Sequence, residues 1–292
     1  AGRRHANIIR KNFSNSKIYI YTKQKIKEYN YFSNLKTILT LKPDYVIIAS
    51  ENNKHFYQLQ FLEKNFKGLK ILVEKPLFDK FKKLNIRKNN VFVGYNLRFH
   101  PFIKNIYNLI KSNQTYDIQF ITNTYLPNWR KTNFKNNYAV SKRKGGGIIL
   151  DLSHELDLAK ILLGEFKILY KNYGKISKLT NDTEDHLKLI GRKRNTNLSI
   201  DLKYFSRNEV RIILVDCKNF SIFADLKNSI FKVAYNNKTI VRKSKVSMYQ
   251  TYLEMHKAVI MKKNFKHLCT YNEGVRLLKL INSIKIKKLN AK

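Results

Sequence analysis

The sequence predicts an α/β protein, in which a doubly wound parallel sheet is followed by an α+β domain with a large, mostly antiparallel sheet. In the first hundred residues, short apolar runs alternate with helix-like segments, which is typical of a parallel sheet covered on both faces. After about residue 100, strand-like stretches follow one another over short links, as in an antiparallel sheet. The chain has 292 residues, enough for two modest domains. We expect them to span residues 1–99 and 100–292.

The individual elements of the first domain follow from local patterns. A helix is expected directly after Gly2, and a continuous apolar strand after Pro43 is followed by a turn and a second helix. The predicted strands cover residues 17–21, 44–50, 69–76 and 90–96, and the predicted helices cover residues 3–12 and 55–66.

The second domain is expected to begin with a helix and a strand, followed by a polar loop and a glycine-hinged helix over residues 145–157. Six strand-like stretches and two closing helices come next. The predicted strands cover residues 116–125, 166–176, 185–193, 197–205, 209–216, 219–226 and 230–236. The predicted helices cover residues 102–112, 249–262 and 272–284.

Charge is the unusual feature of the composition. The chain has 58 Lys and Arg residues against 20 Asp and Glu residues, a formal net charge of +38. The lysines are spread over the whole chain, and Asn, Ile, Tyr and Phe are also abundant, as A+T-rich codons would produce. We therefore expect no specific nucleic-acid partner, although a nucleic-acid binder stays an alternative, and we expect the surface to attract anionic ligands.

The sequence shows no apolar run long enough for a membrane span and no signal peptide. The two cysteines, Cys217 and Cys269, predict neither a disulfide framework nor a metal site. A cytoplasmic protein that does not bind membranes is the expectation.

Polar side chains follow three of the predicted strands of the first domain, at the point where each strand ends. Because the carboxyl ends of parallel strands meet at one edge of the sheet, we expect these side chains to line a cofactor crevice. They are Ser50, Asn53 and His55 after one strand, Glu74 and Lys75 after the next, and Tyr95, Asn96, Arg98 and His100 after the third.

Three segments, "EKP" (74–76), "GYNLRFHP" (94–101) and "GGGIILDLSHELD" (145–157), occur in this order. They resemble the signature segments of the Gfo/Idh/MocA oxidoreductases, and the resemblance covers essentially the whole chain. "YLPNWR" (125–130) and "DTEDH" (182–186) resemble a branch associated with sugars of bacterial surface polysaccharides. The resemblance implies an NAD(P)-binding Rossmann domain over 1–99 and a substrate-binding and oligomerisation domain over 100–292. Family members open with a strand and G-x-G-S-x-G-x-R-H, so we expect this chain to be N-terminally truncated, without its first strand.

The resemblance implies hydride transfer between a nicotinamide and a secondary alcohol of a sugar, cyclitol or nucleotide sugar. His154 would be the base, because its ordinary pKa suits removal of a hydroxyl proton near neutral pH. Asp151, three residues earlier, would lie on the same helix face and orient the imidazole, with Asp157 as a further candidate. Lys75 would stabilise charge on the reacting oxygen. A cis peptide bond before Pro76 is also implied.

The remaining site residues are expected on either side of this centre. The helix start at Gly2 would take the cofactor pyrophosphate, although Gly2 alone is equally a capping residue. Thr22 and Lys23 stand where an acidic residue would favour NAD, so NADP is expected over NAD. The predicted cofactor-binding residues are Gly2, Arg3, Arg4, Thr22, Lys23, Ser50, Asn53, His55, Glu74 and Lys75. The predicted substrate-binding residues are Asn96, Arg98, Trp129, Arg130, Tyr138, Asp151 and His154.

Two further expectations concern activity and assembly. A non-catalytic regulatory or binding protein on the same fold is the alternative to an enzyme, since fold does not guarantee chemistry. An open sheet face in the second domain needs covering, which predicts a homodimer or homotetramer.

Overall fold

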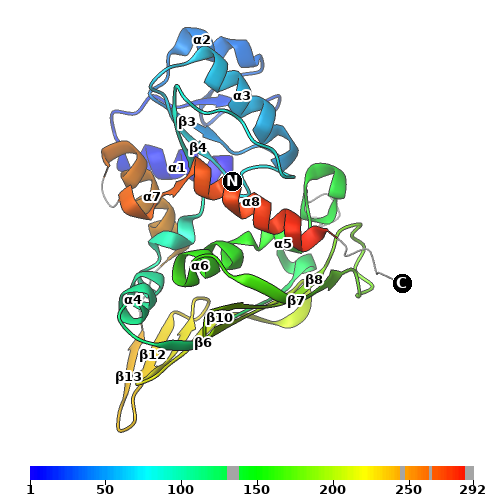
Figure 1. The fold of residues 1–292 in the computed structure, drawn as a ribbon. Helices are drawn as coiled ribbons and strands as arrows, with labels where there is room; N and C mark the ends of the chain where they lie inside the picture. Colours follow the sequence, from blue (N-terminus) through cyan, green and yellow to red (C-terminus); the bar gives the residue numbers. More distant parts are fainter. Residues whose placement is uncertain (130–137, 244–246, 263–264, 287–292) are drawn as a thin grey trace.

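The computed structural model describes residues 1–129, 138–243, 247–262 and 265–286. It has two parts, an α/β unit that contains the N-terminus and a large sheet, with helices lying between them (Figure 1). The expected fold class is confirmed. No helix in the described residues combines the length and apolar character that a membrane span requires.

The N-terminal sheet has three parallel strands, β3 (Tyr45–Ile48), β4 (Lys70–Val73) and β5 (Asn90–Val93). Their apolar side chains are buried because helices cover the sheet, including α1 (Gly2–Asn12) and α3 (His55–Asn65). These elements were predicted from the sequence.

Two strands near the N-terminus do not join this sheet. The expected strand over 17–21 is the shorter β1 (Tyr19–Tyr21), and it pairs in parallel with β2 (Asn30–Phe32), which the sequence did not indicate. A short helix, α2 (Ile38–Leu41), follows them.

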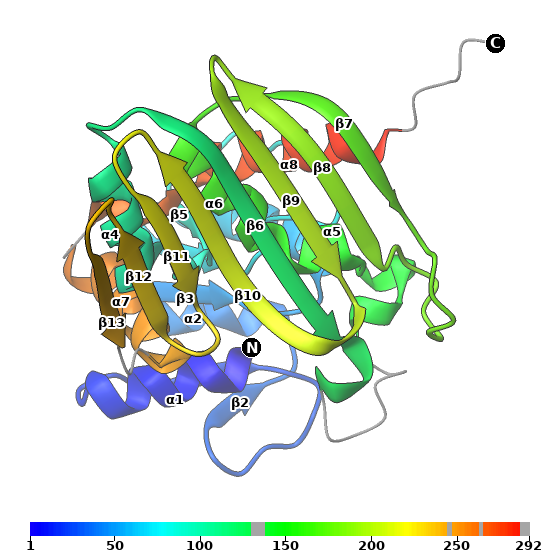
Figure 2. The same ribbon diagram turned by 90° about the horizontal axis from the view of Figure 1, so that it is seen from below.

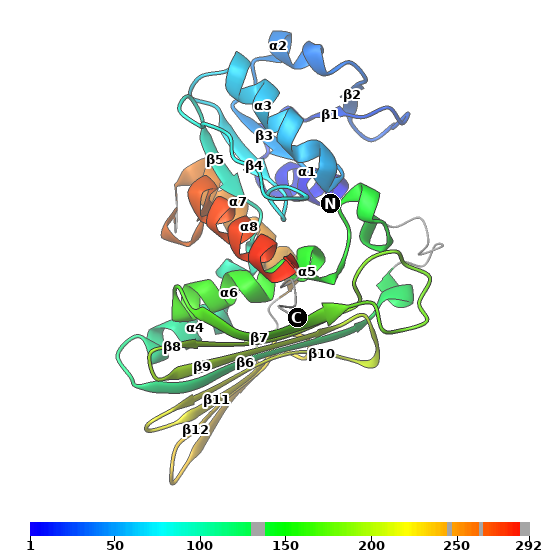
Figure 3. The ribbon, with the colours of Figure 1, turned by 45° about the vertical axis from the view of Figure 1, so that its right-hand side comes forward.

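The end of the chain returns to the N-terminal sheet. Helix α7 (Met248–Met261) packs on α1, and helix α8 (Tyr271–Lys285) packs on β5 (Figure 3). Between these helices lies the short strand β14 (Cys269–Thr270), which adds an antiparallel strand beside β5. The N-terminal unit is therefore completed by residues from beyond residue 247, whereas the sequence analysis divides the chain once, at residue 99.

The large sheet has eight strands in the order β13-β12-β11-β10-β6-β9-β8-β7. All neighbours are antiparallel except β6 and β9, which are parallel. The bounds are β6 Thr115–Tyr125, β7 Lys167–Gly174, β8 His186–Lys193, β9 Thr196–Lys203, β10 Phe205–Cys217, β11 Ser221–Asp225, β12 Ile230–Ala234 and β13 Thr239–Lys243. The sequence analysis did not predict β13.

Side chains alternate across this sheet, as the two-residue period of strands requires. In β6, Ile118, Phe120, Thr122 and Thr124 are buried, and the residues between them are more exposed. One face packs against helices α4 (Pro101–Ile110) and α6 (Ser153–Leu163), and no helix of the described residues covers the opposite face (Figure 2).

The glycine-hinged segment forms a tight turn and two short helices. Gly145 and Gly147 have φ angles of +76° and +112°, a region that favours glycine. A Cβ at Gly146 would lie 2.3 Å from the backbone oxygen of Tyr138. The expectation of one helix over 145–157 is wrong, because α5 (Ile148–Asp151) ends at Leu152, whose backbone is not helical, and α6 begins after it.

Candidate active site

Lys75 lies directly after β4 and points toward α5. Its side chain is 14% exposed, and Nζ donates to the backbone oxygen of Asp151 and lies 3.4 Å from Asp151 Oδ1. The Lys75–Pro76 peptide bond is cis, as the resemblance implies. The structure thus brings together two of the three predicted catalytic residues, although they lie far apart in the sequence.

The carboxylate of Asp151 is also held by two tyrosines. The Tyr138 hydroxyl donates to Oδ1, and the Tyr204 hydroxyl donates to Oδ2 at 2.8 Å. Tyr204 is fully buried, and burial, followed by the charge of Asp151, raises the pKa of its hydroxyl. Tyr204 was missed because the sequence places it inside a predicted strand, where an aromatic residue indicates packing.

His154 is the second residue of α6. Its side chain is buried, and Nδ1 has no hydrogen-bond partner. The imidazole packs edge-on against the ring of Tyr95, with 5.4 Å between ring centroids. Burial, followed by the charges of Lys75 and Arg211, holds the pKa of His154 well below its usual value. His154 is therefore neutral near pH 7, and it is a weaker base than the ordinary histidine that the sequence predicts.

The expected hydrogen bond between Asp151 and His154 is not formed in the described part of the chain. The break at Leu152 separates the two residues into different helices. Asp151 binds Lys75 instead, so its carboxylate acts on the ammonium and not on the imidazole.

Helix α6 is fixed by buried ion pairs on either side of His154. Arg98 binds Asp157 through two nitrogens, at 2.6 and 2.9 Å, and contacts Glu273 at 3.0 Å. Glu155 Oε1 accepts from Arg211 Nε at 2.9 Å and from the Thr122 hydroxyl at 2.8 Å. These pairs tie α6 to α8 and to the large sheet.

Several predicted substrate contacts therefore have other partners in the structure. Arg98 is taken up by carboxylates, and buried Asn96 donates to the Thr251 hydroxyl on α7 at 2.7 Å. Tyr138 lies at the site, on Asp151. The side chain of Trp129 and the whole of Arg130 lie outside the described residues.

On the cofactor side, the first turn of α1 is open to an anion. The turn contains no acidic residue. A Cβ at Gly2 would lie 3.8 Å from Cβ of Ala49, which follows β3, so the turn lies at the carboxyl edge of the sheet. The backbone N–H groups of a helix start fit a pyrophosphate.

The two arginines of that turn point elsewhere. Arg3 pairs with Glu28 at 3.4 Å, and both side chains are exposed. Arg4 donates to the Tyr252 hydroxyl of α7 at 3.0 Å.

The other predicted cofactor-binding residues are spread along the same edge. His55 is buried, and its ring nitrogens contact the backbone oxygens of Pro76 and Ser50, so it supports the loop after Lys75. Asn53 donates to the backbone oxygen of Arg143 at 3.2 Å and connects this edge to the glycine turn.

Four residues complete this set. Ser50 donates to Gln58 at 2.8 Å, and Thr22 accepts from the N–H of Gln24. Lys23 is exposed. Glu74 is buried, and its carboxylate binds His5 and the N–H of Lys75.

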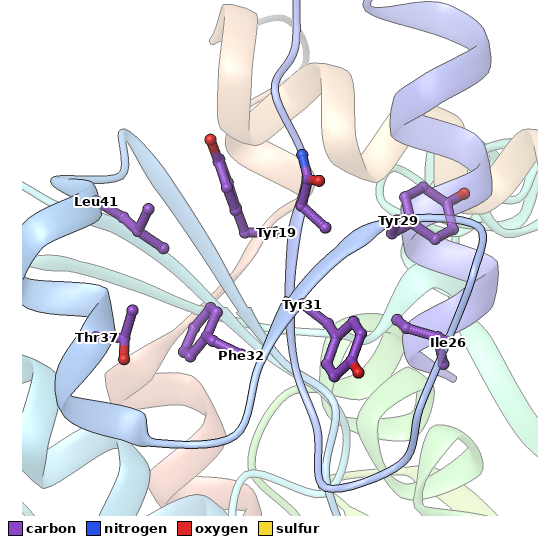
Figure 4. A pocket seen from close by; sticks show the side chains of 8 residues that line it. Tyr19, Ile26, Tyr29, Tyr31, Phe32, Thr37 and Leu41 are labelled. Atoms are coloured by element: carbon purple, nitrogen blue, oxygen red, sulfur yellow. The ribbon is translucent and has the colours of Figure 1, made fainter.

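Two hollows lie outside this constellation. One, of about 510 Å³, is lined by aromatic side chains of β1 and β2, among them Tyr19, Tyr31 and Phe32 (Figure 4). The other, of about 630 Å³, lies around Asn219 and Tyr235. Neither contains a predicted site residue. The described residues also hold no group of His, Cys, Asp and Glu side chains suited to a metal ion.

The chain is similar to known proteins in sequence and in fold. Residues 4–90 match the Gfo/Idh/MocA family model, described as an oxidoreductase family with an NAD-binding Rossmann fold. Residues 4–90 are thus similar to the NAD-binding domain of the Gfo/Idh/MocA oxidoreductases. The resemblance stated from the sequence is thereby confirmed. No curated protein sequence matches the chain.

Solved structures extend the likeness to the large sheet. UDP-N-acetylglucosamine 3-dehydrogenase GnnA from Acidithiobacillus ferrooxidans has 16% identity and a TM-score of 0.76, with 97% of this chain and 92% of that chain covered. The WlbA dehydrogenase from Bordetella pertussis, in complex with NADH and UDP-GlcNAcA, has 14% identity and a TM-score of 0.76, with 97% and 91% covered. A super-repressor mutant of Gal80p from Saccharomyces cerevisiae has 16% identity and a TM-score of 0.80, with 97% and 91% covered. At these identities the likeness shows the fold.

Proposed function

We propose that this protein is an NAD(P)-dependent oxidoreductase that transfers a hydride between the nicotinamide and a secondary alcohol of a sugar, cyclitol or nucleotide sugar. One observation carries the proposal: Lys75 is held on Asp151 while neutral, buried His154 keeps one ring nitrogen without a hydrogen-bond partner. A buried nitrogen without a partner calls for a ligand, because an unmade hydrogen bond is costly in the interior.

Each residue of the site has a distinct task. His154 accepts the hydroxyl proton of the substrate, since its imidazole is neutral at the working pH. Lys75 donates a hydrogen bond to the same oxygen and stabilises its developing negative charge. Asp151, anchored by Tyr138 and Tyr204, keeps the Lys75 ammonium in place.

The nicotinamide cofactor, when bound, supplies the hydride acceptor or donor. The open first turn of α1 would hold its pyrophosphate, and the loops after β3 and β4 would carry the rest toward Lys75. Exposed Lys23, next to Thr22 where an acidic residue would favour NAD, favours NADP over NAD through its positive charge.

The neighbouring structures support a sugar substrate. Two of the three reported above are dehydrogenases, GnnA by name for UDP-N-acetylglucosamine and WlbA in complex with NADH and UDP-GlcNAcA. The substrate would be a nucleotide sugar used for surface-polysaccharide synthesis in the cytoplasm. The high positive charge of the chain supports this, because it attracts diphosphates.

The test is reduction of NAD⁺ or NADP⁺ with a panel of sugars, cyclitols and nucleotide sugars, followed at the nicotinamide absorbance. We expect Lys75→Met and His154→Ala to lower turnover by about a hundredfold or more, the contribution of a placed acid or base. Lys83→Met, at an exposed lysine downstream of Pro76, is the matched control and should keep full turnover. Full turnover in both site variants would refute the mechanism.

The second candidate function is a non-catalytic regulatory protein, which the likeness to a Gal80p super-repressor mutant favours. It predicts that the chain binds a dinucleotide, measured by calorimetry, while no substrate of the panel is turned over. Turnover that depends on Lys75 would exclude it.

A further inference from the structure

A buried row of polar side chains leads away from Lys75 into the packing between four elements. Glu74 Oε1 lies 2.7 Å from His5 Nε2, and His5 Nδ1 lies 2.9 Å from His256 Nε2. His256 Nδ1 lies 3.0 Å from the Tyr45 hydroxyl. We call these four residues the histidine row. They come from the end of β4, from α1, from α7 and from β3, so the row ties these elements together at one point.

The near end of the row fixes the backbone of Lys75. The second oxygen of Glu74, Oε2, accepts the Lys75 N–H at 3.0 Å. A Cβ at Gly94 would lie 3.3 Å from both Oε2 and the Cα of Glu74, so any larger residue there would press against the carboxylate. Both oxygens of Glu74 are thus engaged, and a displaced carboxylate would release the residue that carries the ammonium.

Burial makes the row sensitive to the loss of any member. His5 is 1% exposed, His256 is 0% exposed and Glu74 is 6% exposed. A buried polar group that loses its partner must find another or move, because water cannot replace the hydrogen bond. Removal of the His256 ring therefore acts on His5 first and then on Glu74.

We propose that Glu74 is a positioning residue for Lys75, and that His256 holds Glu74 in place through His5. The inference rests on the proposed function, because Lys75 is the lysine of that site. Turnover would then depend on a residue of the C-terminal helix α7. His256 is hydrogen-bonded to His5 and Tyr45, and it reaches the first turn of α1 only through His5.

Two substitutions at the same position test the link. In His256→Gln, the side-chain amide reaches the place of Nε2 and keeps the contact with His5, whereas His256→Leu removes it. A misplacement of 1 Å costs about a hundredfold in rate, so a shift of part of that distance in His256→Leu should lower kcat on the order of tenfold. KM should change by less than about twofold, since Lys75 stabilises mainly the charge that develops on the substrate oxygen in the transition state, and His256→Gln should restore kcat to within about twofold.

Met255→Ala is the matched control for loosened packing. Met255 is the preceding residue of α7 and is fully buried, but it lies outside the row. We expect this variant to lower the melting temperature at least as much as His256→Leu and to keep kcat. An equal loss of kcat in Met255→Ala, or an unchanged kcat in His256→Leu, would overturn the proposal.

A readout without turnover separates this inference from the proposed function. Glu74 and His256 are joined through His5, so the effects of Glu74→Gln and His256→Leu on the free energy of unfolding should be non-additive in a double-mutant cycle. Tyr45→Phe, which removes only the hydroxyl at the far end, serves as a milder second variant. Additive effects would contradict the row even in an active enzyme. Non-additive effects in a chain that turns over no substrate would contradict the proposed function alone.

Discussion

The acid stability of the protein should depend on Glu74. Burial alone would raise the pKa of this carboxyl, but the hydrogen bond and electrostatic attraction of His5, together with Lys75, outweigh it and lower the pKa from 4.5 to about 2. The difference of about 2.5 pKa units corresponds to about 3 kcal/mol at neutral pH, at 1.36 kcal/mol for each unit. Since the folded pKa lies below the unfolded one, this stabilisation is present above pH 4.5 and is lost as the pH falls toward 2.

The assay compares the wild type with Glu74→Gln by urea unfolding at several pH values. Other carboxyls titrate in the same range, and the difference between the two proteins removes their contribution. Between pH 7 and pH 3, we expect the stability advantage of the wild type to shrink by about 2 kcal/mol, since the carboxyl still has a pKa below 3 when folded. A difference that is constant over this range would refute the reasoning.

Three further predictions follow from the site and the sheet. Because the pKa of His154 is held well below 6.5, its imidazole stays neutral as the pH falls from 7.5 to 6.0. The ratio kcat/KM should therefore remain constant over this range, and a decline centred near pH 6.5 would contradict this. Gly146→Ala should destabilise the fold by about 1–3 kcal/mol in urea unfolding, the cost of forced overpacking, because its Cβ would lie 2.3 Å from the Tyr138 oxygen. Gly174→Ala is the control, because its φ is likewise not positive and a Cβ there would meet His186 at an ordinary contact distance of 3.8 Å. If a homodimer or homotetramer forms through the uncovered sheet face, Ile190→Lys on that face should shift it toward the monomer in sedimentation. Ile176→Lys, at an exposed residue outside the strands, should not, and the same species distribution in both variants would contradict assembly through this face.

The periodicity of the sequence predicted most of the fold. Continuous apolar runs identified β3, β4 and β5, and alternation identified β6, because burial on two faces or one face leaves these patterns directly in the sequence. Strands β13 and β14 were missed. All residues of β13 are exposed, and β14 has two residues, so neither carries a periodic signal.

The sequence motifs also pointed to the residues at the centre of the candidate site, but not to the hydrogen bonds between them. Lys75 and Asp151, both predicted as catalytic residues, lie together in the structure, although no contact between them was predicted, and the cis Lys75–Pro76 bond follows the family pattern. The prediction that Asp151 contacts His154 was wrong. Spacing on an unbroken helix predicts that contact, but the helix breaks at Leu152. The spacing of nearby residues does not predict the tertiary contact between Lys75 and Asp151 that is formed instead.

The histidine row was invisible to sequence reasoning for the same cause. His5 and His256 are 251 positions apart, and each alone is typical of a buried packing residue. Only the return of α7 to α1 brings them together. Tyr204 belongs to the same class, since its contact with Asp151 spans 53 positions.

The central claim is that Lys75 and His154 act on one substrate oxygen beside the nicotinamide. A crystal structure of the chain with NADP⁺ or NAD⁺ and a substrate identified by the panel tests it most directly. We predict that Lys75 Nζ and a ring nitrogen of His154 each lie about 3 Å from the same hydroxyl oxygen, within hydrogen-bond reach. A nicotinamide bound elsewhere, with Lys75 still on Asp151 and His154 without a ligand, would contradict the account.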